Sequence, residues 1–70
     1  MKRKELKSGV IKSVGYNEEE QVLELEFNNG AVWQYFEFTI DDWNNFNAAE
    51  SKGKYFLENI KGKFKEFKID

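Results

Sequence analysis

An alternating segment followed by a tight-turn signal is the feature that most constrains the fold of this 70-residue chain. Residues 22–27 read Val-Leu-Glu-Leu-Glu-Phe, which places the two leucines and Phe27 on one face of a strand and the glutamates on the other. Asn29-Gly30 follows, and this residue pair is typical of a two-residue hairpin turn. We therefore predict an antiparallel hairpin whose returning strand occupies residues 31–38.

The length of this turn decides which face of the sheet receives the aromatic residues of the returning strand. A two-residue turn pairs Phe27 with Val32 and leaves Trp33 and Tyr35 beside the glutamates. A three-residue loop closed by a glycine bulge pairs Phe27 with Ala31 and exchanges the two faces. We favour the two-residue turn, because it keeps the later phenylalanines of the strand in the core.

The rest of the chain predicts one strand before the hairpin, then two helices and a last strand after it. Residues 8–16 read as a strand in which Gly15 marks a bulge or a close backbone approach. Thr39 is a predicted cap for a first helix, and Ser51 is a predicted cap for a short second helix. Residues 64–69 are predicted to form the last strand.

These elements predict an α+β fold, in which a small antiparallel sheet of three to four strands carries one or two helices packed on one face. Residues 1–7 are rich in charge and are predicted to form a frayed N-terminus, so a single domain spans residues 8–70. A folded chain of this mass exposes roughly 4,600 Å² by area scaling. Seven Phe, three Tyr and two Trp residues can supply its core, and association of copies, which also buries surface, stays open.

Composition excludes most catalytic and metal chemistry. The chain has no His and no Cys, which removes Ser-His-Asp triads, thiolate nucleophiles and Cys/His zinc sites. We therefore expect no enzyme activity, no catalytic residues, no metal site and no cofactor. No segment is apolar enough to span a bilayer, and the basic N-terminus lacks the apolar stretch of a signal peptide, so we expect a cytoplasmic protein with no membrane partner.

Charge is segregated along the chain, although the net formal charge is only −2. Residues 1–12 carry five bases against one acid, and residues 52–70 carry six bases against three acids. Residues 13–51 carry nine acids and no base. The molecule should therefore have an electric dipole if its two basic ends meet in space.

Several of these residues together resemble the KTSC domain family. The resemblance rests on Gly15-Tyr16, Leu23 to Phe27, Asn29-Gly30, Trp33 to Phe36, Ala49, and the segment Ser51 to Phe56 that reads Ser-Lys-Gly-Lys-Tyr-Phe. It covers about residues 8–68, with Trp33 in place of the first Tyr of the family's Tyr-x-Tyr and Thr39 where the family usually has Pro. The family occurs at the C-terminus of some lysyl-tRNA synthetases and as stand-alone proteins of bacteria and phages. The resemblance implies RNA binding only as a suggestion, and it implies no catalytic residues.

Trp33 and Tyr35 form the first candidate ligand-binding pair. Aromatic residues two apart on a strand can stack unpaired bases, whereas the ordinary explanation is that both pack in the core. In the favoured register Glu24, Glu26 and Glu37 are their neighbours, and these carboxylates would repel phosphates.

The segment from Ser51 to Tyr55 forms the second candidate site. Ser51 and the backbone N–H groups of Lys52 and Gly53 can hold an anion at a helix start, with Lys54 and Tyr55 beside them. The ordinary explanation is a helix cap, a tight glycine contact and solvated lysines.

We therefore expect a non-catalytic binding module for RNA, single-stranded nucleic acid or another phosphate-bearing ligand such as a nucleotide. The alternative is a small phage- or bacterial-type protein that binds and inhibits a host protein, or that sequesters a small nucleotide signal. A protein partner with a basic surface would meet the acidic centre of the chain. That centre consists of Glu24, Glu26, Glu37, Asp41 and Asp42 around Trp33 and Trp43.

Overall fold

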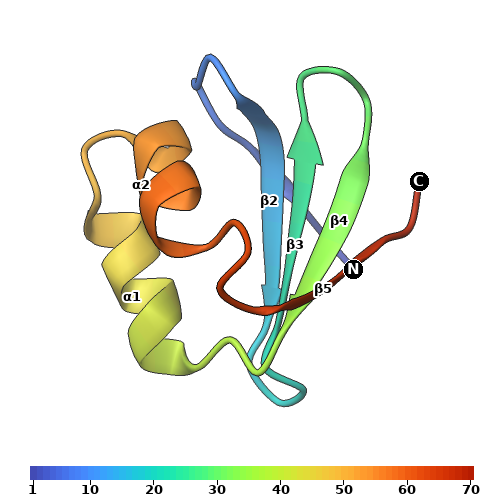
Figure 1. Ribbon diagram of the computed structural model, residues 1–70, viewed down its shortest axis with the longest axis vertical. Helices are drawn as coiled ribbons and strands as arrows, with labels where there is room; N and C mark the ends of the chain where they lie inside the picture. The colour runs from blue at the N-terminus through green and yellow to red at the C-terminus, as the bar shows by residue number, and fades with distance from the viewer.

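The computed structural model describes residues 1–70 as a five-stranded antiparallel sheet with two helices on one face (Figure 1). Its strands lie in space in the order of the sequence: β1 (Lys4–Glu5), β2 (Ile11–Asn17), β3 (Val22–Phe27), β4 (Val32–Phe36) and β5 (Lys65–Lys68). The helices α1 (Ile40–Ala48) and α2 (Lys52–Asn59) connect β4 to β5. The α+β class is confirmed, with five strands instead of three to four, because Lys4 and Glu5 add a strand at the N-terminal edge that was not predicted. The exposed surface of 4696 Å² is close to the expected area.

The hairpin between β3 and β4 has the three-residue loop, so the favoured two-residue register is wrong. The Phe27 N–H donates a hydrogen bond to the Ala31 C=O at 2.8 Å. Gly30 has φ +91°, the left-handed conformation that a glycine bulge requires. Trp33 and Tyr35 consequently lie opposite the two leucines of β3, on the face that the helices cover.

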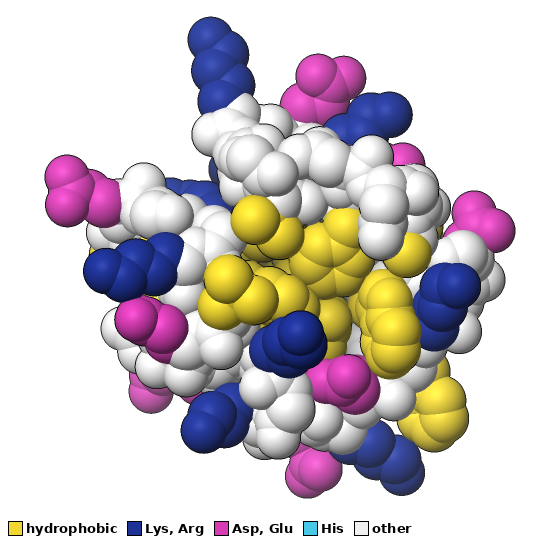
Figure 2. Space-filling model, turned by 45° about the horizontal axis from the view of Figure 1, so that its top comes forward, with side chains coloured by type: hydrophobic (Ala, Val, Ile, Leu, Met, Phe, Trp, Pro, Cys, Tyr) yellow, Lys and Arg dark blue, Asp and Glu magenta, His cyan; other side chains and the backbone are white.

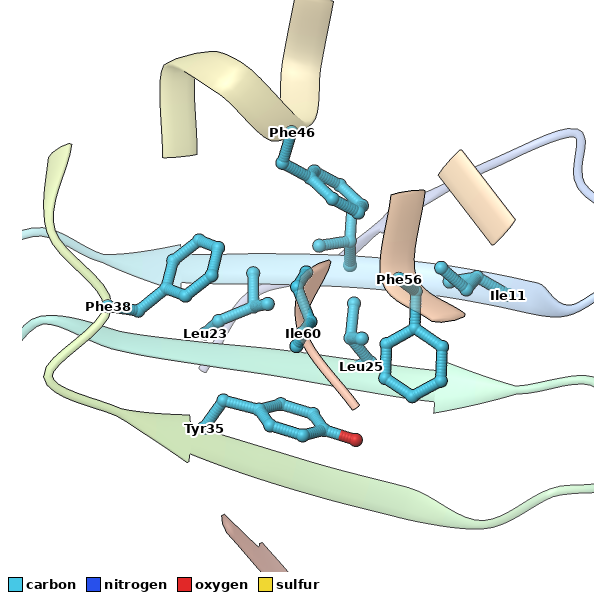
Figure 3. Close-up of a cluster of buried hydrophobic side chains, with 9 residues drawn as sticks. Ile11, Leu23, Leu25, Tyr35, Phe38, Phe46, Phe56 and Ile60 are labelled. Carbon is cyan, nitrogen blue, oxygen red and sulfur yellow. The ribbon is translucent and has the colours of Figure 1, made fainter. Parts of the chain in front are cut away.

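The core lies between this face of the sheet and the two helices (Figure 3). Phe38 joins it because the chain bends after β4 at Glu37, which has φ +57°, and the Phe38 N–H donates to the Gln21 C=O at 2.9 Å. The buried cluster consists of Ile11, Val14, Leu23, Leu25, Tyr35, Phe38, Phe46, Phe56 and Ile60.

Both predicted helix caps are confirmed. The Thr39 side chain accepts a hydrogen bond from the Asp42 N–H, and the Asp42 carboxylate accepts one from the Thr39 N–H, so the two residues form a capping box. The Ser51 hydroxyl accepts a hydrogen bond from the Lys54 N–H at 3.1 Å. Gly62, with φ +74°, lies in the turn after α2.

The N-terminal segment was predicted to be frayed, but it forms a strand. Lys4 and Glu5 pair with β2, and Leu6 packs against the core. The residues before β1 cross the other face of the sheet over Gly15, where an added Cβ would lie 2.7 Å from the Lys2 carbonyl oxygen. The predicted close approach at Gly15 is therefore confirmed, and it explains why the N-terminus is held.

A polar network occupies the face of the sheet opposite the helices. The Arg3 guanidinium pairs with the Glu24 carboxylate, which is almost fully buried, and its Nε donates to the Ser13 hydroxyl at 3.0 Å. The Ser13 hydroxyl donates to Glu26 at 2.9 Å, and the Gln34 amide donates to Glu24 at 2.8 Å. This network satisfies the carboxylates of β3, because each buried acceptor has a donor.

Acidic residues gather at one end of the molecule. The β2–β3 turn and the start of α1 lie side by side there, at the bottom of Figure 1. This end carries Glu18, Glu19, Glu20, Glu37, Asp41 and Asp42. Neither helix has the length and apolar composition needed to cross a membrane.

Candidate ligand-binding groove

A groove of about 280 Å³ opens between α2 and the strands β3, β4 and β5. Figure 2 shows apolar side chains gathered in a hollow on one face of the molecule, with basic and acidic side chains around them. The volume is just below the roughly 300–1,000 Å³ typical of drug-sized ligands, which suits a single small ring system. The groove is lined by Phe27, Trp33, Tyr35, Phe56, Lys61 and Glu66.

Trp33 forms the partly exposed wall of this groove. It lies on β4, and its cross-strand neighbour on β5 is Lys68. The side chain packs against the core without being buried, so part of its ring is open to a ligand. An aromatic wall next to an ammonium group suits a ligand that has both a flat ring and a negative charge.

Tyr35 forms the floor of the groove and is only 2% exposed. Its ring packs edge-on against Phe56, and Figure 3 shows its hydroxyl end on the side of Phe56. No fully buried side-chain polar atom of the chain lacks a hydrogen-bond partner. The Tyr35 hydroxyl makes no hydrogen bond within the protein, so this atom is not fully buried and opens into the groove. Burial, together with the negative charge of Glu66, raises the pKa of the Tyr35 hydroxyl well above its ordinary value, so the groove presents a neutral phenol.

The polar rim of the groove comes from the turn after α2 and from β5. Lys61 is exposed, and Glu66 lies opposite Tyr35 in the β4–β5 pairing. The Glu66 carboxylate accepts a hydrogen bond from the Gly62 N–H at 3.3 Å, which orients it. One carboxylate and one ammonium group therefore stand at the edge of an aromatic hollow.

The second predicted segment lies at the start of α2 and does not line the groove. Ser51 caps the helix, and the Lys52 ammonium donates to the Ala49 C=O at 2.7 Å and the Asn47 C=O at 3.0 Å. An added Cβ on Gly53 would lie 3.1 Å from the side chain of Val10, so this glycine permits a close contact between α2 and the loop before β2.

Lys54 and Tyr55 complete that segment. Lys54 is exposed, and Tyr55 is half-buried with its ring edge-on to Phe46. Both line a shallow hollow of about 400 Å³ that also contains the carboxylates of Glu50 and Glu58. The structure therefore separates the two predicted sites and gives the second one packing and capping roles.

Two of the three carboxylates that stood against a stacking role lie elsewhere. Glu24 and Glu26 are on the opposite face of the sheet from Trp33, where both pair with Arg3. The register correction thus removes them from the aromatic pair. Glu66 is the acidic neighbour of the aromatic pair instead. Because Glu66 lies far from the pair in the sequence, the local pattern of residues did not reveal this contact.

Sequence reasoning assigned Phe27 and Phe56 to the core alone and gave no role to Glu66. The groove depends on the pairing of the last strand, β5, with β4. This pairing places Glu66 and Lys68 beside the aromatic pair. No group of three or more acidic side chains lies close enough to hold a metal ion.

Comparison with known proteins shows which family the chain resembles. The family model described as "KTSC domain" matches residues 7–64. A lysine–tRNA ligase of Nostoc punctiforme is 41% identical over 56 residues, which is 80% of this chain and 10% of the ligase. The chain therefore spans about a tenth of the length of the lysine–tRNA ligases that it matches.

Two further proteins are similar along nearly their whole length. An uncharacterized protein of Stutzerimonas stutzeri is 34% identical over 71 residues, covering 100% of each chain. The crystal structure of a KTSC domain protein from Yersinia pestis matches with a TM-score of 0.91 at 37% identity, covering 99% of this chain and 97% of that one.

Proposed function

This chain belongs to the KTSC domain family, and we propose that it is a non-catalytic module that binds single-stranded RNA through the groove beside Trp33. The observation that carries the proposal is the half-buried Trp33 ring on the wall of an aromatic hollow, with Lys68 directly across the strand pair. Unpaired bases stack on such rings, and lysines beside them neutralise the phosphates.

The family context supports the same ligand class. Lysine–tRNA ligases are among the relatives, and by name these proteins act on an RNA. The match covers a tenth of their length, so RNA binding by this chain is an inference from the groove and not a transfer of ligase activity.

The charges around the groove favour a short contact with the RNA backbone. Lys61 lines the groove and Lys68 faces its wall, while Lys63 and Lys65 lie between them in the chain. Each phosphate that these lysines neutralise contributes a slope of about −0.7 to log affinity against log salt for a single strand. We expect two to three such contacts, and a correspondingly shallow salt dependence.

Fluorescence anisotropy with a labelled ten-nucleotide single-stranded RNA tests the proposal at 50 and 200 mM salt. Trp33→Ala should weaken binding by about 5- to 150-fold, the loss of one stacked base. Phe67→Ala is the control, because it removes an aromatic ring on the other face of the sheet that is 55% exposed and therefore more accessible than the half-buried Trp33 ring. Equal effects of the two substitutions, or the absence of salt dependence, would contradict the proposal.

Charge reversal separates the groove from the start of α2. Lys68→Glu should weaken RNA binding, whereas Lys12→Glu, which makes the same charge change outside the groove, should weaken it much less. Lys54→Glu tests the second predicted segment. If Lys54→Glu is the most damaging of the three variants, the RNA contacts the start of α2 instead.

The protein-binding alternative has less support in the structure. Its acidic centre required Glu24 and Glu26 beside Trp33, and both carboxylates are paired with Arg3 on the opposite face. Sequestration of a nucleotide would use the groove in the same way as RNA. If a mononucleotide displaces the ten-nucleotide RNA at concentrations near the dissociation constant of that RNA, the nucleotide alternative is favoured.

A further inference from the structure

We infer that the groove selects a guanine base, whose Watson–Crick edge is recognised by the Glu66 carboxylate. This inference rests on the proposed RNA function and adds the identity of the base. Its basis is the combination of four aromatic rings, one of them the Tyr35 phenol with its neutral hydroxyl, with one oriented carboxylate and one ammonium group.

The walls of the groove fix the ligand as a flat ring. Phe27 and Phe56 lie with ring centroids 5.0 Å apart, and Trp33 lines the groove with them. The hollow is smaller than a drug-sized pocket, and its apolar surface favours a stacked base over a sugar or a phosphate.

The carboxylate decides which base edge fits. Guanine presents two adjacent donors, the N1–H and the N2 amino group, and a carboxylate with two acceptor oxygens can take both. Adenine and cytosine each place an acceptor beside their amino group, and uracil places acceptors on both sides of its N3–H, so a carboxylate gains one hydrogen bond and meets a repulsive lone pair. The Gly62 N–H occupies one lone pair of Glu66, which leaves both oxygens able to accept from a ligand.

The other polar groups of the groove complement the same base. Guanine has its O6 acceptor next to N1–H, and the Lys61 ammonium, which lines the groove, is a donor of the right kind for it. The Tyr35 hydroxyl has no partner in the protein and can donate to or accept from the ligand. Glu66 and Lys61 together thus match a donor-donor-acceptor edge, which guanine alone among the four bases presents.

Four seven-nucleotide RNAs test the selection, each with uridines around a central guanosine, inosine, adenosine or uridine. The guanosine strand should bind about ten-fold more tightly than the adenosine strand, as expected for a bidentate base contact. Inosine lacks the N2 amino group and should lose several-fold relative to guanosine. Glu66→Gln should remove most of the preference for guanosine. The control Glu58→Gln removes the charge of an exposed glutamate on α2, outside the groove, and should retain the preference.

The outcomes separate this inference from the proposed function. If all four strands bind equally while Trp33→Ala still weakens binding, RNA binding stands and guanine selection is refuted. If Glu66→Gln leaves a guanosine preference unchanged, Glu66 is not the group that recognises the base and the inference is likewise refuted. If none of the strands binds, both proposals fall.

Discussion

Trp33 on β4 lies directly opposite Lys68 on β5, on the face of the sheet that the helices cover. The pairing brings an aromatic ring from the middle of the chain next to an ammonium group from its end. It also places Glu66 opposite Tyr35, so the last strand supplies the charged side of the groove. The candidate site therefore depends on β5, which is an edge strand whose residues are mostly exposed.

The close approach at Gly15 predicts a large effect of a small substitution. Gly15→Ala should lower the free energy of unfolding by about 1–3 kcal/mol, because its Cβ would lie 2.7 Å from the backbone oxygen of Lys2 and push the N-terminal segment away. Gly9→Ala is the control, since nothing lies within 4 Å of its added Cβ. Urea denaturation measures both variants, and equal stabilities would show that the N-terminal segment moves without cost.

The partly buried ion pair between Arg3 and Glu24, on the opposite face, predicts that the N-terminus matters for stability. Arg3→Ala should cost about 2 kcal/mol, less than the roughly 3–5 kcal/mol for a fully buried pair, because 28% of the Arg3 side chain is exposed. The loss arises mainly from leaving Glu24 buried without its counter-charge. Lys4→Ala removes a neighbouring positive charge that has no ion pair and should change the unfolding free energy by less than about 0.5 kcal/mol. Similar losses in both variants would refute a specific role for the pair.

The cap at Ser51 predicts a separation of stability from binding. Ser51→Ala should lower the unfolding free energy by about 1 kcal/mol, because the Lys54 N–H loses its acceptor. Thr39→Ala should cost a similar amount through loss of the capping box of α1. Under conditions where both variants are folded, neither should change RNA affinity. A selective loss of RNA affinity in Ser51→Ala would instead support an anion site at the start of α2.

The raised pKa of Tyr35 predicts a loss of stability at alkaline pH. The unfolded tyrosine ionises near pH 10, whereas burial keeps the folded phenol protonated to higher pH. The unfolded state therefore binds fewer protons above about pH 10, and the contribution of this group to stability falls as the pH rises. Tyr35→Phe should remove that share of the loss.

Comparison of urea midpoints at pH 9 and pH 11 measures this effect. At pH 9 the unfolding free energies of the unmodified protein and of Tyr35→Phe should differ by less than about 0.5–1 kcal/mol, because the Tyr35 hydroxyl has no hydrogen-bond partner in the protein to lose. At pH 11 the difference should shift in favour of Tyr35→Phe. An identical pH dependence in both proteins would mean that the hydroxyl is freely solvated in the folded state.

Local patterns predicted the elements of this fold well. The two capping residues act through hydrogen bonds within a few residues, and the alternation in residues 22–27 follows from the two-residue period of a strand, so the consequences of both can be read from the neighbouring sequence. The hairpin register could not be read in this way. Asn29-Gly30 suits both loop lengths, and the Asn29 side chain accepts the Ala31 N–H at 2.9 Å in the longer loop.

The candidate site shows the same division. Trp33 was predicted from its own strand and lines the groove, but its partners come from segments that are distant in the chain. The register was decided by packing, because the longer loop buries the Tyr35 ring against Phe56 and leaves the polar face to the Arg3 network. A pattern of alternating residues is compatible with either face, so only the helices above the sheet could choose between them.

By itself, the sequence determined the α+β class, the order of the main elements, the starts of both helices and the exclusion of His- and Cys-based chemistry, because each follows from local hydrogen bonding, from residue alternation or from composition. The tertiary structure decided the strand order at both edges, the register of the central hairpin and the assembly of the groove from Trp33, Lys61 and Glu66. These features depend on which residues from distant parts of the chain meet, and that is set by how the large aromatic side chains fill one shared core.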